Sequence, residues 1–260
     1  RVHAHGGLIY LDGANMNAIL GITRPGDFGA DMMHFNPHKT FSGPHGGGGP
    51  GAGPICVSEK LAPYLPVPIV REQDGNFYLE NERAKSIGKV RSFFGNVGVL
   101  IRAYCYIRTH GPDGLKRVSE NAVLNANYVM ARLKGTYNAP FPGPCMHECL
   151  FDDHSLKDTG VSTLDLAKGM IDEGFHPMTM YFPLVVHGAM LIEPTESESK
   201  QSLDLFCDTM LHLMERAQSG DAEWLHDAPH LAPWSRLDET AAARRPVLTW
   251  KPDPETNRAT

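Results

Sequence analysis

The sequence predicts an α/β protein, in which part of a larger domain is followed by a smaller α+β domain. Three short apolar runs occur early in the chain, two long stretches with helical spacing come next, and runs in β-α-β-β order follow residue 144. We therefore expect a larger domain at residues 1–110, a small α+β domain at residues 111–222 and an extended tail at residues 223–260.

The early apolar runs are short enough to be strands of one sheet. GLIYLD at residues 7–12 ends in an acid, which suits a buried strand with an exposed carboxyl end, so Asp12 is expected at that end. A second run at residues 32–35 follows the turn-rich TRPGDFG, and a third at residues 54–58 follows a glycine tract.

Helical spacing begins at residue 97. Apolar residues recur at steps of three and four over residues 97–110 and again over residues 113–133, with Gly135 as a stop. The later part is predicted to contain strands in CMHECLF, residues 179–186 and AMLIEP, a helix at residues 164–173 and an amphipathic helix at residues 197–217. After Ser219 the apolar residues show no regular spacing, and we expect this tail to wrap the surface or a neighbouring subunit.

Composition excludes several classes of protein. A net charge of −6 gives no basic footprint for nucleic acid, and no apolar run approaches the roughly 20 residues of a membrane span. We find no signal peptide, and the first residue, Arg1, indicates a fragment or a processed product. The histidines match no common zinc motif, so no metal site is expected.

The five cysteines are scattered and lack C-x-x-C spacing, which favours a reducing, cytoplasmic location. Cys145 and Cys149 are four residues apart, so a regulatory disulfide between them remains an alternative.

The segment from Asp12 to Pro54 carries the residues suited to chemistry. An enzyme that uses pyridoxal 5′-phosphate (PLP) needs a lysine to hold the cofactor's aldehyde and an acid to keep its pyridine nitrogen protonated. Lys39 and Asp12 supply these types, each close behind a predicted strand, so both could reach one crevice at the carboxyl edge of a sheet. Taken singly, a strand-end Asp is more often a turn residue and a lone Lys a surface charge.

The tract GPHGGGGPGAGP contains a formal G-x-G-x-x-G from Gly46 to Gly51. Four consecutive glycines match that pattern trivially, and prolines interrupt the helix that a dinucleotide site requires. We interpret the tract as backbone that can approach a ligand closely, with a flexible linker as the alternative.

Taken together, YLDGANMNA, RPGDFGAD, HKTF, HGGGGPGAGP and IEPTESES closely resemble the glycine decarboxylase family, the P-protein of the glycine cleavage system. The resemblance is to the C-terminal half, and the closing RRPVLTWKP is similar to the second subunit of the two-polypeptide form. It implies a fold-type I PLP-dependent transferase-like fold with Lys39 as the Schiff-base lysine and Asp12 as the partner of the pyridine nitrogen. Ala14 would pack against the ring, and His38 would neighbour the phosphate or the ring.

The resemblance also implies an activity and partners. The family decarboxylates glycine and transfers the aminomethyl group to the lipoyl arm of the H-protein, and this chain would work with the other P-protein subunit in a hetero-oligomer. The family's phosphate loop and ring-stacking residue are not found in this sequence, so the fragment alone is not expected to bind PLP tightly or to be active. An Arg suits the glycine carboxylate, but the sequence does not choose among Arg24, Arg71, Arg91 and Arg102.

Two alternatives stay open at this point. One is another fold-type I enzyme, such as an amino-acid decarboxylase, an aminotransferase or a desulfurase, although a desulfurase would need a reactive cysteine on a mobile loop. The other is a non-catalytic subunit, which would be expected to have lost the lysine.

Overall fold

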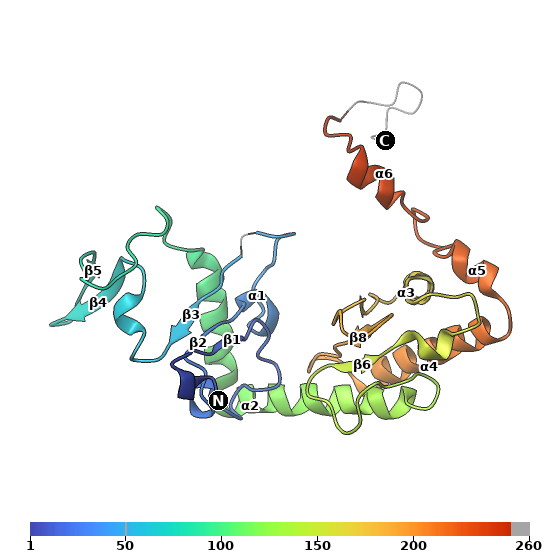
Figure 1. Cartoon of the computed structure of the whole chain (residues 1–260), viewed down its shortest axis with the longest axis horizontal. Helices are drawn as coiled ribbons and strands as arrows, with labels where there is room; N and C mark the ends of the chain where they lie inside the picture. The colour runs from blue at the N-terminus through green and yellow to red at the C-terminus, as the bar shows by residue number, and fades with distance from the viewer. Residues whose placement is uncertain (50, 251–260) are drawn as a thin grey trace. The chain divides into compact units, whose positions relative to one another are not determined.

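The computed structural model describes residues 1–49 and 51–250, arranged in two compact units (Figure 1). Unit 1 comprises Arg1–Tyr128, Pro144–Cys149 and Glu193–Glu198, and unit 2 comprises the intervening segments and the remainder of the chain. Pro50 of the glycine tract and the last two residues of RRPVLTWKP lie outside the described residues. The domain boundaries expected at residues 110 and 222 stay a prediction.

Unit 1 is built on a three-stranded sheet in the order β1-β2-β3. Strands β1 (Tyr10–Asp12) and β2 (Met32–His34) are parallel, and β3 (Ile55–Val57) pairs antiparallel with β2, so all three predicted strands are confirmed. The 3₁₀ helices His3–His5 and Pro25–Phe28 precede and follow β1, and the one-turn helix α1 (Pro37–Thr40) follows β2. The nearby core contains the buried side chains of Leu20, Phe41, Ala103 and Val118.

A hairpin that the sequence analysis did not predict also belongs to unit 1. Strands β4 (Ile69–Gln73) and β5 (Asn76–Glu80) pair antiparallel after the 3₁₀ helix Ala62–Tyr64. Asp74 and Gly75 connect them, both with positive φ (54° and 79°). Asp-Gly is a strong hairpin signal because a type I′ turn needs positive φ at both central residues.

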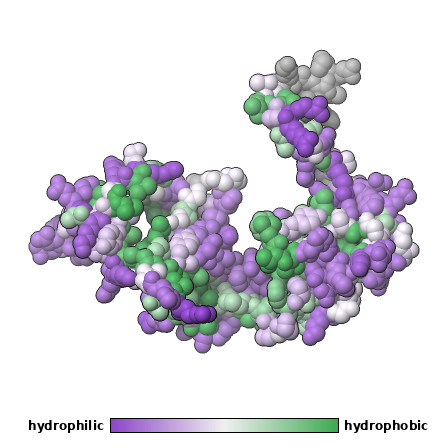
Figure 2. Space-filling model, in the orientation of Figure 1, coloured by the Kyte–Doolittle hydropathy of each residue, from purple (hydrophilic) through white to green (hydrophobic). Residues whose placement is uncertain are grey.

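The long helix α2 (Val97–Leu133) is two helices joined at a kink. Gly111 has φ 61° and ψ −176°, and Pro112 follows it, so the backbone cannot continue the regular hydrogen bonding there. The two predicted helices are thus confirmed. On the first half, large apolar side chains at the three- and four-residue spacing of one helix face are exposed: Val97, Leu100, Ile101 and Tyr104. Figure 2 shows that apolar patches occur on the molecular surface.

Unit 2 combines a three-stranded sheet with packed helices. The strand order is β6 (Cys149–Phe151), β8 (Met190–Ile192), β7 (Thr179–Met180), after which α4 (Lys200–Gln218) continues the chain. Between β6 and β7 lie the 3₁₀ helix Asp153–Leu156 and α3 (Thr163–Asp172). The predicted apolar stripe of α4 is buried at Leu203, Met210, Leu213 and Ala217, while Phe206 is half-buried against the ring of Phe175.

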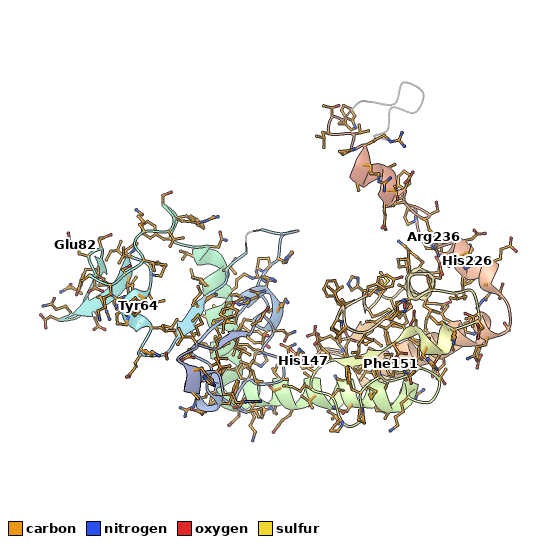
Figure 3. All side chains as sticks on the ribbon, viewed as in Figure 1. Tyr64, Glu82, His147, Phe151, His226 and Arg236 are labelled. Carbon is orange, nitrogen blue, oxygen red and sulfur yellow. The ribbon has the colours of Figure 1, made fainter. Side chains whose placement is uncertain are left out.

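The described part of the expected tail contains two short helices. Helices α5 (Ala222–Asp227) and α6 (Glu239–Arg244) form there, and Leu225 of α5 is fully buried. Arg236, which lies between them, donates from Nη2 to Oδ1 of Asp165 (2.6 Å), and Nε2 of His226 on α5 lies 3.9 Å from Oδ2 of the same carboxylate (Figure 3). Both helices are too short to show a hydrophobic period, and α5 is stabilised by contacts with α3 and α4.

Asp165 joins the tail to the start of α3, which generates the first prediction. Its side chain completes a capping box with Ser162. Burial raises the pKa of Asp165, but the hydrogen bonds from Ser162 and Arg236 lower it by more, so the pKa lies below its ordinary value. We expect Asp165→Ala to lower the free energy of unfolding of unit 2 by about 1–3 kcal/mol at pH 7. Because the folded pKa lies below the unfolded one, this contribution should be present at neutral pH and lost as the pH falls below about 4.

Urea unfolding followed by tryptophan fluorescence measures this effect, because all three tryptophans of the chain lie in unit 2. The matched control is Glu215→Ala, an exposed carboxylate on α4. An equal loss in both variants, or a loss at Asp165 that is the same at pH 7 and pH 3, would contradict the assignment.

Candidate functional site

The parallel pairing of β1 with β2 brings two chain segments to one sheet edge. Asp12 pairs with His34 in register, so both strands end side by side, and the segments that follow leave from the same edge. Ligand sites of open α/β sheets lie outside this carboxyl edge. The Asp12 carboxylate is mostly exposed here, with Oδ1 accepting from the Ala14 N–H (3.1 Å) and lying 3.5 Å from His34 Nε2.

Two hydrogen bonds connect the loop after β1 to the segment after β2. The Asn36 N–H donates to the Ala14 carbonyl (3.0 Å), and the Met16 N–H donates to Oγ1 of the buried Thr40 (2.8 Å). Pro37 begins α1, as its fixed φ suits the first turn of a helix, and Lys39 lies within that turn. The positions of Asp12 and Lys39 are therefore set by one hydrogen-bonded substructure.

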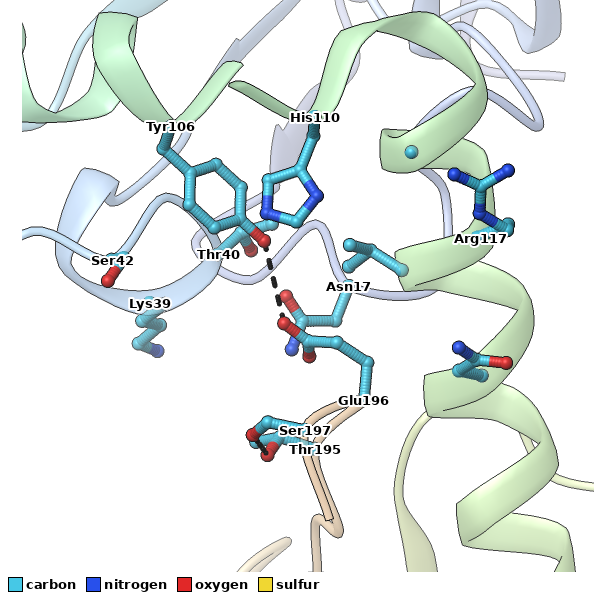
Figure 4. A pocket seen from close by; sticks show the side chains of 13 residues that line it. Asn17, Lys39, Thr40, Ser42, Tyr106, His110, Arg117, Thr195, Glu196 and Ser197 are labelled. Carbon is cyan, nitrogen blue, oxygen red and sulfur yellow. Dashed lines mark hydrogen bonds between the residues drawn. The ribbon is translucent and has the colours of Figure 1, made fainter. Parts of the chain in front are cut away.

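Lys39 lines a pocket of about 590 Å³ inside unit 1 (Figure 4). This volume lies in the range of small-molecule sites. Its walls come from the loop after β1, α1, both halves of α2 and residues 195–197, and the lining is rich in hydroxyl, amide and charged groups: Asn17, Lys39, Thr40, Ser42, Tyr106, His110, Arg117, Asn121, Thr195, Glu196 and Ser197.

Tyr106 and Glu196 face each other across this pocket. The tyrosine hydroxyl donates to Glu196 Oε1 (3.5 Å), and its ring lies 4.4 Å from that of His110. Loss of solvent and the negative charge of Glu196 raise the pKa of Tyr106 to about 12. The hydroxyl consequently remains a hydrogen-bond donor throughout the physiological pH range.

The structure places the four predicted site residues in different surroundings. Lys39 lines the pocket and is exposed, whereas Asp12, Ala14 and His38 do not line it. The His38 ring packs edge-on against that of His45 at 4.7 Å, and its Nδ1 is buried without a hydrogen-bond partner among the described residues. Burial, and then the nearby positive charges of His45 and Lys39, lower the pKa of His38, which favours the neutral ring.

The sequence analysis missed the pocket residues that lie far from Lys39 in the chain. Tyr106 lies in the helix predicted at residues 97–110, where no site residue was expected, and Glu196 belongs to IEPTESES, for whose acids no role was predicted. Among the arginines considered for a carboxylate, Arg24 pairs with Asp27 and Arg71 with Glu80. None of the four lines the pocket, whereas Arg117 does.

The glycine tract shows where conformational freedom is needed. Gly46, Gly47 and Gly48 all have positive φ (64°, 69° and 114°), and added Cβ atoms at Gly47 and Gly48 would meet no neighbour. At Gly43 a Cβ atom would lie 3.1 Å from the Pro37 carbonyl oxygen, which also accepts the Gly43 N–H (3.0 Å). Backbone geometry is therefore the constraint at Gly47 and Gly48, and close approach to α1 is the constraint at Gly43.

Residues 1–49 and 51–250 contain no group of three His, Cys, Asp or Glu side chains arranged to hold a metal ion. Cys56, Cys105, Cys145 and Cys207 are free thiols, and burial raises the pKa of the Cys145 thiol and raises that of Cys207 to about 11. None of the helices in these residues is long and apolar enough to cross a membrane.

Comparison with known proteins gives close relatives. The family described as "Glycine dehydrogenase, C-terminal domain" matches residues 118–231. The probable glycine dehydrogenase (decarboxylating) subunit 2 of Caulobacter vibrioides is 58% identical over 256 residues, covering 96% of this chain and 49% of the relative. The corresponding protein of Rhodopirellula baltica is 56% identical over 260 residues, covering 96% and 51%. The chain spans about half the length of these relatives.

Solved structures share the fold. A glycine decarboxylase (P-protein) of the glycine cleavage system in inhibitor-bound form has a TM-score of 0.66 at 20% identity, covering 82% of this chain and 49% of that one. The cysteine desulfurase of Thermococcus onnurineus NA1 has a TM-score of 0.59 at 17% identity, covering 82% and 54%. The predicted mixed α/β fold of the fold-type I PLP enzymes is thus confirmed.

Proposed function

We propose a function that proceeds from one premise: this chain belongs to the glycine dehydrogenase (decarboxylating) subunit 2 family and corresponds to about half of that subunit. In this proposal the chain contributes to PLP-dependent decarboxylation of glycine and to transfer of the aminomethyl group to the lipoylated H-protein. The observation that carries it is the position of Lys39, in a pocket beside the carboxyl edge of a parallel strand pair that ends in Asp12.

The residues at this edge fit PLP in their chemistry. An amine and a carboxylate lie at or just beyond the ends of adjacent parallel strands, and among the described residues the buried Nδ1 of His38 has no hydrogen-bond partner. Lys39 would hold the cofactor through Nζ, Asp12 would keep the ring nitrogen protonated, and Ala14 would pack against the ring. When bound, PLP supplies the electron sink that makes loss of carbon dioxide from glycine feasible.

The chain's own groups would then handle binding and proton transfer. A released Lys39 amine can carry a proton to and from the reacting carbon, since it lines the same pocket. Tyr106 stays protonated and holds the carboxylate of Glu196 at the opposite wall. The guanidinium of Arg117 supplies the pocket with a cation that suits the carboxylate of glycine.

A partner polypeptide is part of the proposal. The relatives are named as subunit 2 of their enzyme, which implies another subunit. The exposed apolar face on the first half of α2 is the kind of surface that protein interfaces bury. We therefore propose a hetero-oligomer that acts on glycine and on the lipoylated H-protein.

Lys39 is expected to carry PLP, because it alone among the lysines lines the described pocket. Borohydride reduction of the natural protein that carries this sequence, followed by peptide mass spectrometry, should recover the pyridoxyl group on Lys39. Lys39→Ala should abolish this labelling, and the control Lys60→Ala should retain it. Recovery of the label on Lys60 or Lys85 would sink the assignment.

Asp12→Asn should preserve the fold and PLP binding while slowing catalysis, because an amide cannot hold the ring proton electrostatically. We expect exchange of carbon dioxide into glycine to fall at least about tenfold, or roughly 1.4 kcal/mol of barrier. The matched control is Asp27→Asn, an exposed acid paired with Arg24. Wild-type exchange by Asp12→Asn with PLP fully bound would show that Asp12 is only a turn residue.

A further inference from the structure

Residues 193–198 occupy an unusual place in the chain. They connect β8 to α4, both of which are in unit 2, yet their own contacts place them in unit 1. Thr195, Glu196 and Ser197 form part of the wall of the pocket that Lys39 lines (Figure 4). The pocket therefore depends on a segment more than 150 residues from Lys39 in sequence being held in place.

Glu193 joins this segment to the loop after β1. Its Oε1 accepts hydrogen bonds from Nδ2 of Asn15 and from Nδ2 of Asn17 (3.4 Å). Asn17 is 4% exposed and lines the pocket, and the Asn15 side chain also accepts the Asn17 N–H (2.8 Å). Hydrogen bonds to a carboxylate are stronger than those between neutral groups, so one acid stabilises the conformations of two loop residues.

Weaker hydrogen bonds hold the rest of residues 193–198. Nδ2 of Asn125 donates to the carbonyls of Thr195 (2.9 Å) and Glu198 (3.4 Å). The bond from Tyr106 to Glu196 is long, at 3.5 Å. Among the described interactions, Glu193 makes the one charged connection between residues 193–198 and the loop that carries Ala14.

We propose that Glu193 is a positioning residue, which docks residues 193–198 on the loop after β1 and so fixes one wall of the Lys39 pocket. Its importance for catalysis rests on the proposed function, but its structural role does not. Lys39 is near enough for its charge to act on the Glu193 carboxyl.

Glu193 is an exposed residue, so its hydrogen bonds, more than burial, favour a specific role. Loss of solvent raises the pKa of Glu193, and the hydrogen bond from Asn15 counters this shift, as do the positive charges of His147 and Lys39, while Glu148 opposes them. Asn15 and Asn17 donate to this exposed carboxylate, and both follow Asp12 closely in the chain.

Hydrogen exchange tests the docking without any ligand. In the natural protein that carries this sequence, Glu193→Ala should speed amide exchange at least about tenfold in peptides covering residues 13–17 and 193–198. Glu193→Gln keeps an acceptor oxygen and should stay within about threefold of wild type, as should the control Glu198→Ala, whose exposed side chain is in the same segment.

Asn15→Ala provides a second route, because it removes a donor while leaving Glu193 in place. It should loosen the same two peptides, and combining it with Glu193→Ala should add little, since both changes remove one interaction. Unchanged exchange in both single variants, or Glu193→Gln behaving like Glu193→Ala, would overturn the proposal.

Titration with PLP, followed by absorbance, connects the docking to the pocket. Affinity should fall at least about tenfold in Glu193→Ala and remain near wild type in Glu193→Gln and Glu198→Ala. Faster amide exchange with unchanged affinity for PLP would show that Glu193 does not fix the wall of the Lys39 pocket. If the wild-type protein itself bound no PLP, the proposed function would fail, and the exchange rates alone would decide the docking role.

Discussion

The hydrogen-bonded parallel pairing of β1 with β2 is the constraint on which the rest of the site depends. In register, it ends both strands at one edge, with Asp12 beside His34. Bonds from Asn36 to Ala14 and from Met16 to Thr40 then extend the pairing into the following loops. The amine of Lys39 on α1 and the carboxylate of Asp12 at the end of β1 therefore lie at the same edge, although they are 27 residues apart in sequence.

The pocket adds distant segments to this edge. The kink of α2 at Gly111 separates two helical stretches, and both contribute side chains, Tyr106 before the kink and Arg117 after it. Residues 195–197 close the lining, and Glu193 ties that segment to Asn15 and Asn17. Three parts of the chain thus meet around Lys39 within unit 1, and the similarity to glycine dehydrogenase (decarboxylating) subunit 2 supports the function proposed for this meeting point.

Local sequence patterns predicted the elements that short apolar runs or a strong helical spacing of apolar residues mark in the sequence. The three early strands, the two halves of α2, α3 and α4 all formed near the expected residues. The hairpin at Asp74 and Gly75 was missed although its turn signal was present, and α5 was missed because burial of Leu225, more than any period, stabilises it. Lys39 was identified from its neighbours in sequence, whereas Glu193 and Glu196 act through contacts that no local pattern encodes. Which residues hold the cofactor stays a prediction.

Replacing Thr40 by Val tests most directly whether the bonded loops set the site. The change is nearly isosteric at a position only 3% exposed, and it removes the oxygen that accepts the Met16 N–H. Amide exchange at Met16 should rise at least about tenfold and PLP binding should weaken, while Thr40→Ser, which keeps the hydroxyl, should retain both. Unchanged exchange at Met16, or faster exchange with PLP bound as tightly as in wild type, would contradict the central claim that this hydrogen-bonded edge positions Lys39.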